Sequence, residues 1–371
     1  MKWRWWSRWA AEWQEEAHEH IGDGVNPRLV AIALGAIVAT LLALGIYWSR
    51  EPAPFDVTAS FNRTLREPTA HPVAGAVTTA TLVQIVTTLL DKPGGFINND
   101  IAPPGVWLDN MPSWERGALQ QARDMTRALR DDFGRAGANA EPDEDLAHAQ
   151  PRLNFSESSW MLPSSESQYR DARDYLRAYL LNLQKGVRLQ KSGEPTAVFA
   201  ATPANLDRYL AQVALRLDAL AQRLSACVTP RENLLLQSGA RELGVRATTP
   251  AYQIDNVFYE ARGSAWALLH LLRAIEIDFA VVLREKNAQN ALHAVIRDLD
   301  ATQDTIYSPV ILNGSGFGLL ANHSLVMASY IARANTAAAN VRRLLTEIAP
   351  APDATTERST NASATTEQEA K

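Results

Sequence analysis

Apolar residues dominate one uninterrupted segment near the start of the chain, from Leu29 to Trp48. These 20 residues include no Asp, Glu, Lys, Arg or His. At about 1.5 Å rise per residue, a helix of that length crosses a hydrocarbon layer of roughly 30 Å. Tyr47 and Trp48 end the segment with amphipathic rings of the kind that settle at headgroup depth. The pattern predicts a transmembrane helix at residues 29–48.

Two other interpretations of this segment are weaker. A cleaved signal peptide has an apolar region of about 7–15 residues and a small-residue cleavage site. This run is longer, and Trp48-Ser49-Arg50-Glu51-Pro52 follows it. A core helix of a soluble protein rarely stays uncharged over such a length, and Gly35 and Gly45 are typical of membrane helices. We therefore expect an uncleaved membrane anchor.

A proline-punctuated stretch at residues 49–76 follows, and we expect it to be a stalk that spaces a domain from the bilayer. Beyond it, apolar residues recur at helical spacing along most of the chain. The final residues, 349–371, have almost no apolar bulk and are expected to be disordered. The predicted helices cover residues 77–90, 110–133, 165–187, 203–227, 265–283, 288–302 and 321–347.

The apolar positions also indicate how these helices pack. From Leu206 to Leu224 they step by four and three alternately, which is the seam of helices packed at a shallow angle. The helix after residue 265 carries apolar side chains around nearly its whole circumference, so we expect it at the centre of a bundle. The predicted fold class is all-α: a single transmembrane helix followed by a helical-bundle domain at residues 77–348.

Two segments of the domain resemble each other when they are aligned without a gap. Residues 104–133 and 250–279 share nine identities in thirty positions, more than two unrelated amphipathic helices usually share. The hypothesis is that the domain consists of two related halves, residues 77–190 and 203–348; the alternative is chance. Each segment has an Asp-Asn pair placed to cap a helix, followed by an Arg-Gly pair. The glycines would let another backbone approach closely. The matched pairs are Pro104/Pro250, Asp109/Asp255, Asn110/Asn256, Arg116/Arg262, Gly117/Gly263, Arg127/Arg273, Ala128/Ala274, Asp132/Asp278 and Phe133/Phe279.

The distribution of charge bears on partners and on orientation. The formal net charge is -5, and residues 1–50 carry five basic and five acidic residues, so the whole excess lies beyond the span. This balance argues against a nucleic-acid partner. Basic residues flank the span almost equally, but a tail with five acidic residues is poorly suited to translocation. We predict a single-pass protein of the bacterial inner membrane, with a cytoplasmic tail at residues 1–28 and a periplasmic domain.

Tryptophans in that tail give a second membrane signal. On a helix, Trp5, Trp6, Trp9 and Trp13 fall within one arc of about 100°, and the nearby arginines project from a separate side. This pattern is typical of a helix that lies in the membrane surface. The alternative is a tryptophan-rich tail that only helps targeting.

The segment GGFINNDIAPPGVWLDNMPSWERG, residues 94–117, is rich in turn formers and predicts an ordered loop that leads into a helix. Asp109 or Asn110 is placed to cap that helix, with Pro112 in the first turn, where a missing N–H costs nothing. Together with NGSGFGLLANHSLVMASYIARAN, residues 313–335, the segment resembles the proteobacterial membrane-anchored family known as domain of unknown function 2333. The resemblance runs from the anchor through the last predicted helix. It implies an envelope protein, and it transfers no activity and no functional residue.

Two classes of function are compatible with these features. The first is a structural or interaction module of the cell envelope, held by inner-membrane lipid and binding another envelope protein through turn-borne aromatic residues. Its contact residues would be Trp107, Trp114 and Asn110. The alternative is a cell-wall glycan hydrolase, which needs two carboxyl groups about 5–9.5 Å apart across an open cleft. Its candidate carboxylates are Asp100, Asp109 and Glu115.

Other candidate sites have simpler explanations. Gly314, Gly316 and Gly318 precede a helix, but they fit neither standard nucleotide-binding pattern and no Lys follows. Instead of a phosphate site, we expect Asn322, His323 and Ser324 to cap or pack against that helix. The lone Cys227 excludes an internal disulfide, and it lies on an apolar seam that suits a buried thiol. The seven histidines form no close ligand pair on a helical face outside the tail. We expect neither a metal nor a cofactor.

A polar strip runs along the predicted central helix. His270, Arg273 and Glu276 are spaced by three and therefore share one side of it. One interpretation is a buried acid–base group. The preferred interpretation is an internal ion pair.

Overall fold

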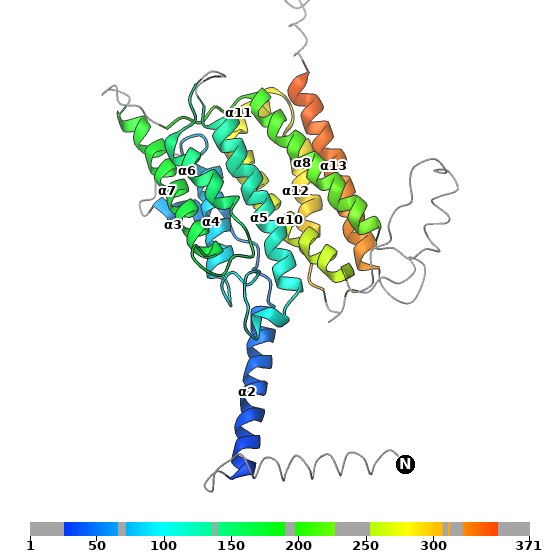
Figure 1. Cartoon of the computed structure of the whole chain (residues 1–371). Helices are drawn as coiled ribbons and strands as arrows, with labels where there is room; N and C mark the ends of the chain where they lie inside the picture. The colour runs from blue at the N-terminus through cyan, green and yellow to red at the C-terminus, as the bar shows by residue number, and fades with distance from the viewer. Residues whose placement is uncertain are drawn as a thin grey trace, which may run out of the picture.

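The computed structural model describes residues 26–65, 72–135, 137, 140–189, 197–226, 253–306, 311 and 322–347. These residues form helices and loops, and none of them lies in a β-strand. A single helix projects from one end of a helical bundle (Figure 1). The all-α prediction is confirmed. Several predictions concern residues outside those described. They are the predictions for Trp5, Trp6, Trp9 and Trp13, for Cys227, for Gly314, Gly316 and Gly318, and for the tail after residue 348.

The projecting helix is α2, Pro27–Trp48. Asn26 caps it by accepting a hydrogen bond from the N–H of Arg28, and Pro27 occupies its first turn, as expected for a helix start. Most of its side chains are exposed in the isolated chain. Its length and composition are sufficient for it to cross a membrane.

Residues 49–65 do not form the predicted free stalk. They include a helix, α3, Val57–Leu65, which packs on the bundle and buries Val57 and Phe61. Asp56 caps α3 by accepting hydrogen bonds from the N–H groups of Thr58 and Ala59. The prolines set the path of this segment, but its apolar side chains bind it to the domain.

The described helices of the bundle fall into two groups along the chain. The first comprises α4, Ala76–Asp91; α5, Asn110–Ala128, continued by a π-helical turn, η2, Leu129–Phe133; α6, Glu144–Leu153; and α7, Ser165–Leu189. The second comprises α8, Pro203–Ser225; α10, Ile254–Asp278; the short α11, Ala280–Glu285; α12, Gln289–Ala301; and α13, His323–Thr346. The helix predictions beyond the span are therefore confirmed in type, and the central helix begins earlier than expected.

The two groups pack by the same scheme. In the first, α4 contacts α5 and α7, and α6 contacts α5 and α7. In the second, α8 contacts α10 and α13, and α12 contacts α10 and α13. This correspondence is what the hypothesis of two related halves expects. One detail differs: Asp109 precedes α5, whereas Asp255 lies inside the first turn of α10.

The two groups meet along α5 and α10. A Cβ atom on Gly117 would overlap the carbonyl oxygen of Glu260, and one on Gly263 would overlap that of Trp114. The predicted close backbone approach is therefore confirmed, and it is reciprocal between matched glycines. Farther along, the rings of Phe133 and Phe279 lie 5.4 Å apart. Because matched residues meet at both levels, the two helices run parallel.

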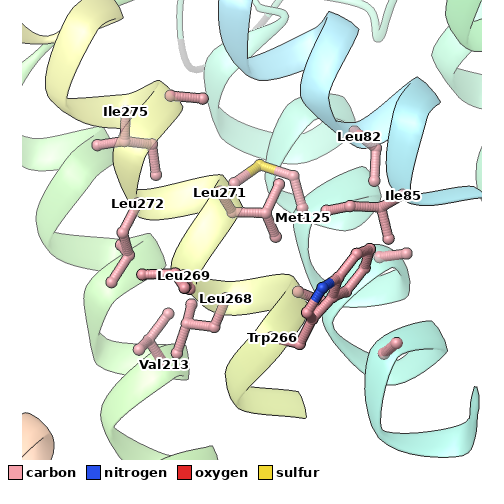
Figure 2. Packing of buried hydrophobic residues seen from close by; sticks show 14 of the residues in the cluster. Leu82, Ile85, Met125, Val213, Trp266, Leu268, Leu269, Leu271, Leu272 and Ile275 are labelled. Carbon is pink, nitrogen blue, oxygen red and sulfur yellow. The ribbon is translucent and has the colours of Figure 1, made fainter. Parts of the chain in front are cut away.

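The hydrophobic core is centred on α10, as its all-round apolar pattern predicts. Figure 2 shows Leu269 and Leu272 on the side of Val213 of α8. It shows Leu271 beside Met125 of α5, and Trp266 on the side of α4 and α5. Nearly every residue from Ala261 to Ile275 is buried. At about 25 cal/mol per Å² of apolar area removed from water, this packing is the main stabilising contribution to the fold.

Candidate functional site

The loop between α4 and α5, residues 92–109, lies at the end of the bundle from which α2 projects (Figure 1). It includes a short helical turn, η1, Gly105–Trp107, which contacts α2. The ring of Trp48 packs over Gly94, and a Cβ atom added to Gly94 would lie only 2.8 Å from Cγ and Cδ2 of Trp48. The φ angle of Gly94 is 85°, in the left-handed region that favours glycine. The loop and the end of α2 therefore form one packed unit.

A buried ion pair fixes the shape of this loop. Lys92 Nζ lies 2.6 Å from Glu115 Oε1, and the two side chains are 1% and 0% exposed. Glu115 also accepts hydrogen bonds from the backbone N–H groups of Ile97 and Asn98, at 2.9 and 2.8 Å. Lys92 donates to the carbonyl oxygen of Gly95. Burial raises the pKa of Glu115, and Lys92 together with the two N–H groups opposes that rise.

Two asparagines join a second loop, between α6 and α7, to the first. Asn99 Nδ2 donates to the carbonyl oxygen of Ser159 and to Glu166 Oε2, at 2.9 and 2.8 Å. Asn98 Nδ2 donates to the carbonyl oxygen of Glu157. Residues 154–164 are therefore held at the same end of the bundle.

The segment after α2 is attached to α10 through Glu51 and Phe55. Glu51 Oε2 accepts a hydrogen bond from Arg262 Nε at 2.6 Å, and Arg262 is 8% exposed at its side chain. The same guanidinium group donates to the carbonyl oxygens of residues 302–304, just beyond α12. Phe55 stacks on His270 with ring centroids 3.9 Å apart. The projecting helix therefore enters the bundle through a fixed connection.

His270 is held in one neutral form by its partners. The N–H of Phe55 donates to Nε2 at 2.9 Å, so that nitrogen carries a lone pair. Nδ1 lies 2.6 Å from the carbonyl oxygen of Trp266 and must carry the proton. Burial lowers the pKa of His270 to about 4. Its buried ring stabilises the attachment of the N-terminal segment, and nothing in this geometry requires it to move a proton.

A family model described as an uncharacterized protein conserved in bacteria (DUF2333) matches residues 24–347. The chain belongs to this family. No curated protein and no solved structure matches the chain. The DUF2333 region begins just before α2 and ends just after α13, so it includes both the apolar helix and the bundle.

In this DUF2333 protein the three candidate carboxylates have different surroundings. Glu115 is buried in its ion pair, and Asp109 is exposed on the surface. Asp109 occupies the predicted N-cap position of α5, but its side chain makes no capping hydrogen bond. Asp100 is half-buried against Gly105. Burial raises the pKa of Asp100, and the negative charge of Glu166 raises it further. Burial of Glu115 therefore removes one of the three candidate carboxylates from contact with a substrate.

The predicted contact residues are also separated by the fold. Trp107 is 57% exposed at the end of η1. Trp114 is 0% exposed and packs on Trp266 with ring centroids 5.0 Å apart, so its assignment to a contact surface is wrong. Asn110 is half-buried, and its Oδ1 has no hydrogen-bond partner among the described residues. Tyr47 and Trp48 lie at the end of α2, as predicted.

The polar strip on α10 does not form the expected internal ion pair. Arg273 pairs with Asp300 of α12 at 2.8 Å. Glu276 pairs with His293, also of α12. Arg273 and Glu276 therefore both bind α12, whereas His270 binds Phe55 and the carbonyl oxygen of Trp266. Among the residues that the structure describes, no group of three or more His, Cys, Asp or Glu side chains could hold a metal ion.

Sequence reasoning missed the attachment of the N-terminal segment. Glu51 and Arg262 are 211 positions apart, and His270 and Phe55 are 215 apart, so no local pattern links them. One signal was available: Arg262 interrupts an otherwise apolar helix face, and a buried arginine requires partners. That signal indicates a buried partner without identifying it.

Proposed function

We propose that this protein is a membrane-anchored structural or interaction module of the bacterial cell envelope. Helix α2 spans the inner membrane with the N-terminus in the cytoplasm, and the helical bundle stands in the periplasm. The bundle binds another envelope protein and holds it at a fixed place relative to the membrane surface.

One observation carries this proposal: an exposed apolar helix is joined to a bundle without a free linker. Helix α2 has a length and composition suited to a bilayer and little cover from the rest of the chain. The Glu51–Arg262 ion pair and the Phe55–His270 stack fix its connection. Such a connection suits a protein that must present a surface in one orientation.

The hydrolase alternative gains no support from the carboxylates. A glycosidase needs an acid and a second carboxylate that both reach the substrate. Glu115 is enclosed by Lys92 and two backbone N–H groups, so it does not reach a substrate. We therefore argue for an interaction module.

The first experiment tests the anchor and its orientation in cells. Membranes that contain the full-length protein are washed in alkaline carbonate, and spheroplasts are treated with a protease before and after lysis. We expect the protein to stay with the membrane and the bundle to be cut in intact spheroplasts. Extraction by carbonate would contradict the anchor, and cleavage only after lysis would contradict the orientation.

The second experiment tests the interaction. A photoreactive amino acid is placed at Leu215, which is 67% exposed on α8, and at the buried Leu217 as a matched control. We expect irradiation of intact cells to give a discrete crosslinked species from exposed positions of the bundle and none from position 217. Repeating the scan over the exposed faces of α7, α8 and α13 without any crosslinked species would contradict a protein partner.

A further inference from the structure

We propose that the end of the bundle next to α2 carries a second membrane contact, formed by the loop tips at residues 101–107 and 160–162. Their apolar side chains enter the interfacial layer of the same leaflet from which α2 emerges. The proposed occupant is lipid. This inference rests on the anchor in the proposed function and adds a contact that the anchor alone does not require.

The first support is a concentration of exposed apolar side chains on these two loops. Leu162 is 95% exposed, which is extreme for a leucine on a folded domain. Exposed apolar side chains that are grouped together usually mark a contact with a membrane or a partner. The other members of the group, each more than half exposed, are Ile101, Val106, Trp107, Trp160 and Met161.

The second support is the depth of the first loop relative to α2. A Cβ atom on Gly45 would lie 3.6 Å from Pro104 Cβ and 3.9 Å from Leu108 Cδ2. Gly45 is three residues before Trp48, which is about 4.5 Å along a helix axis. The flanks of η1 therefore lie beside the last apolar turn of the span, at the depth where Tyr and Trp rings collect in a bilayer.

The third support is that the loops are held in place. Glu115 and Lys92 fix the first loop from inside, and Asn99 ties it to the carbonyl oxygen of Ser159. The second loop therefore shares the level of the first. Figure 1 shows the cyan loop between α4 and α5 directly beside the emerging end of α2. Exposed tips on a fixed base can enter an interface without first becoming ordered.

The chemistry of the group favours lipid over a protein partner. The surface is continuous with a helix that a bilayer surrounds, so a lipid interface covers it without any further molecule. Two tryptophans among six side chains match the composition of interfacial belts. Charged side chains of both signs flank this surface, including the exposed Asp109 and Arg50, and residues 101–107 and 160–162 themselves carry no charge. The contact therefore depends on apolar insertion and not on attraction to anionic lipid.

The test uses fluorescent reporters on the full-length protein in vesicles. In a Cys227→Ser background, single cysteines replace Val106, Leu162 or Val281 and carry a nitrobenzoxadiazole label. Val281 is the matched control, because it is 61% exposed on α11, at the opposite end of the bundle (Figure 1). The vesicles are phosphatidylcholine with or without spin-labelled phosphatidylcholine.

We expect labels at 106 and 162 to be blue-shifted and to lose most of their emission to the spin-labelled lipid, while the label at 281 loses little. Adding anionic lipid should not change this result. Equal quenching at all three positions, or none at 106 and 162, would overturn the inference. Quenching at 106 and 162 that appears only with anionic lipid would overturn the apolar mechanism.

A second variant separates this contact from the anchor. Trp107→Glu combined with Trp160→Glu places charges on two exposed positions and leaves α2 unchanged. We expect the reporter at 162 to lose its blue shift and its quenching, while the protein stays in the carbonate-washed membrane. Release of the unsubstituted protein by carbonate contradicts the anchor itself. Retention of that protein with water-exposed reporters contradicts the second contact alone.

Discussion

Glu115 shows how much one buried side chain can decide at the residue scale. Its carboxylate receives Lys92 and the backbone N–H groups of residues 97 and 98, so it satisfies three donors that the loop would otherwise leave buried. Such a pair contributes little net stability compared with apolar residues, but removal of one partner leaves the other charge uncompensated. Its role is to give the loop a single shape.

Glu115→Gln is therefore expected to destabilise the protein strongly. The substitution keeps the size of the side chain and leaves Lys92 charged and buried, which costs roughly 3–5 kcal/mol of unfolding free energy. Chemical denaturation in detergent, followed by circular dichroism, measures the change. The matched control is Glu347→Gln, which removes a surface ion pair with Arg343 and should cost less than about 1 kcal/mol. Similar losses in the two variants would contradict the structural role of Glu115.

Two groups on α10, the buried His270 and the half-buried Asp278, should oppose each other in the pH dependence of stability. Burial lowers the pKa of His270 to about 4, so between that value and 6.5 only the unfolded chain takes up this proton. Stability from His270 therefore rises with pH. Burial raises the pKa of Asp278 to about 6, although N–H groups at the start of α4 oppose the rise. Between 3.8 and about 6 only the folded chain holds that proton, so stability from Asp278 falls with rising pH.

Single substitutions should reveal these opposed contributions. His270→Gln removes the contribution that rises with pH and leaves that of Asp278, which falls with pH. Its unfolding free energy should therefore decrease more steeply from pH 4 to 6 than that of the unsubstituted protein. Asp278→Asn leaves the contribution of His270, which rises with pH. The slope of its unfolding free energy against pH should therefore shift in the opposite direction. Denaturant titrations at several pH values measure both slopes. Two variants with the same pH slope as the unsubstituted protein would rule out this linkage.

At the scale of elements, the contact between α5 and α10 depends on two glycines at matched positions. Each side lacks a Cβ atom where the other backbone passes, so the two helices approach closely along their whole parallel course. Close approach brings both helices into van der Waals contact over a long interface. The interface between the two groups of helices is therefore set by backbone geometry as well as by side-chain volume.

Gly117→Ala and Gly263→Ala are each expected to cost about 1–3 kcal/mol, because the added methyl group overlaps a backbone carbonyl that cannot rotate away. The double variant should cost less than the sum, since one shift of the helices relieves both overlaps. Gly137→Ala is the control, because nothing lies within 4 Å of a Cβ atom there. Thermal unfolding measures all four proteins. An additive double variant would show that the two sites are independent.

At the scale of the whole molecule, the attachment of residues 49–65 sets how the bundle meets the membrane. Figure 1 shows α2 leaving one end of the bundle, roughly along the direction of its helices. With no free stalk, the bundle should stand upright on that end. Helices α7 and α13, of 25 and 24 residues, then give a height of roughly 35–40 Å.

Atomic force microscopy of the protein in a supported bilayer should show this height with a narrow distribution. The comparison is a variant with Glu51→Gln and Phe55→Ala, which removes the ion pair with Arg262 and the ring stack on His270. That variant should keep its anchor and show lower and more broadly distributed heights, because residues 49–55 lose two of the side-chain contacts that hold them on α10 and the bundle can tilt more easily. A broad distribution for the unsubstituted protein would mean that the attachment does not fix its orientation.

The sequence by itself determined the helices and their inward faces. The apolar run of α2, the seam from Leu206 to Leu224 and the all-round apolar α10 were recognisable because helical periodicity is local and burial follows it. The matched glycines were recognisable too, since a Gly in a helix costs stability unless close packing needs it. These features depend on residues within a few turns of one another.

Only the tertiary structure decided which residues of the candidate site face outward and what the N-terminal segment binds. Trp107 and Trp114 have the same chemistry, but packing against Trp266 buries one and leaves the other exposed. Glu51 and Phe55 bind Arg262 and His270, which lie more than two hundred positions away in the sequence. Glu115 forms a buried ion pair with Lys92 and is not a surface carboxylate. Burial and charge pairing depend on neighbours in space, and those neighbours come from distant parts of the chain.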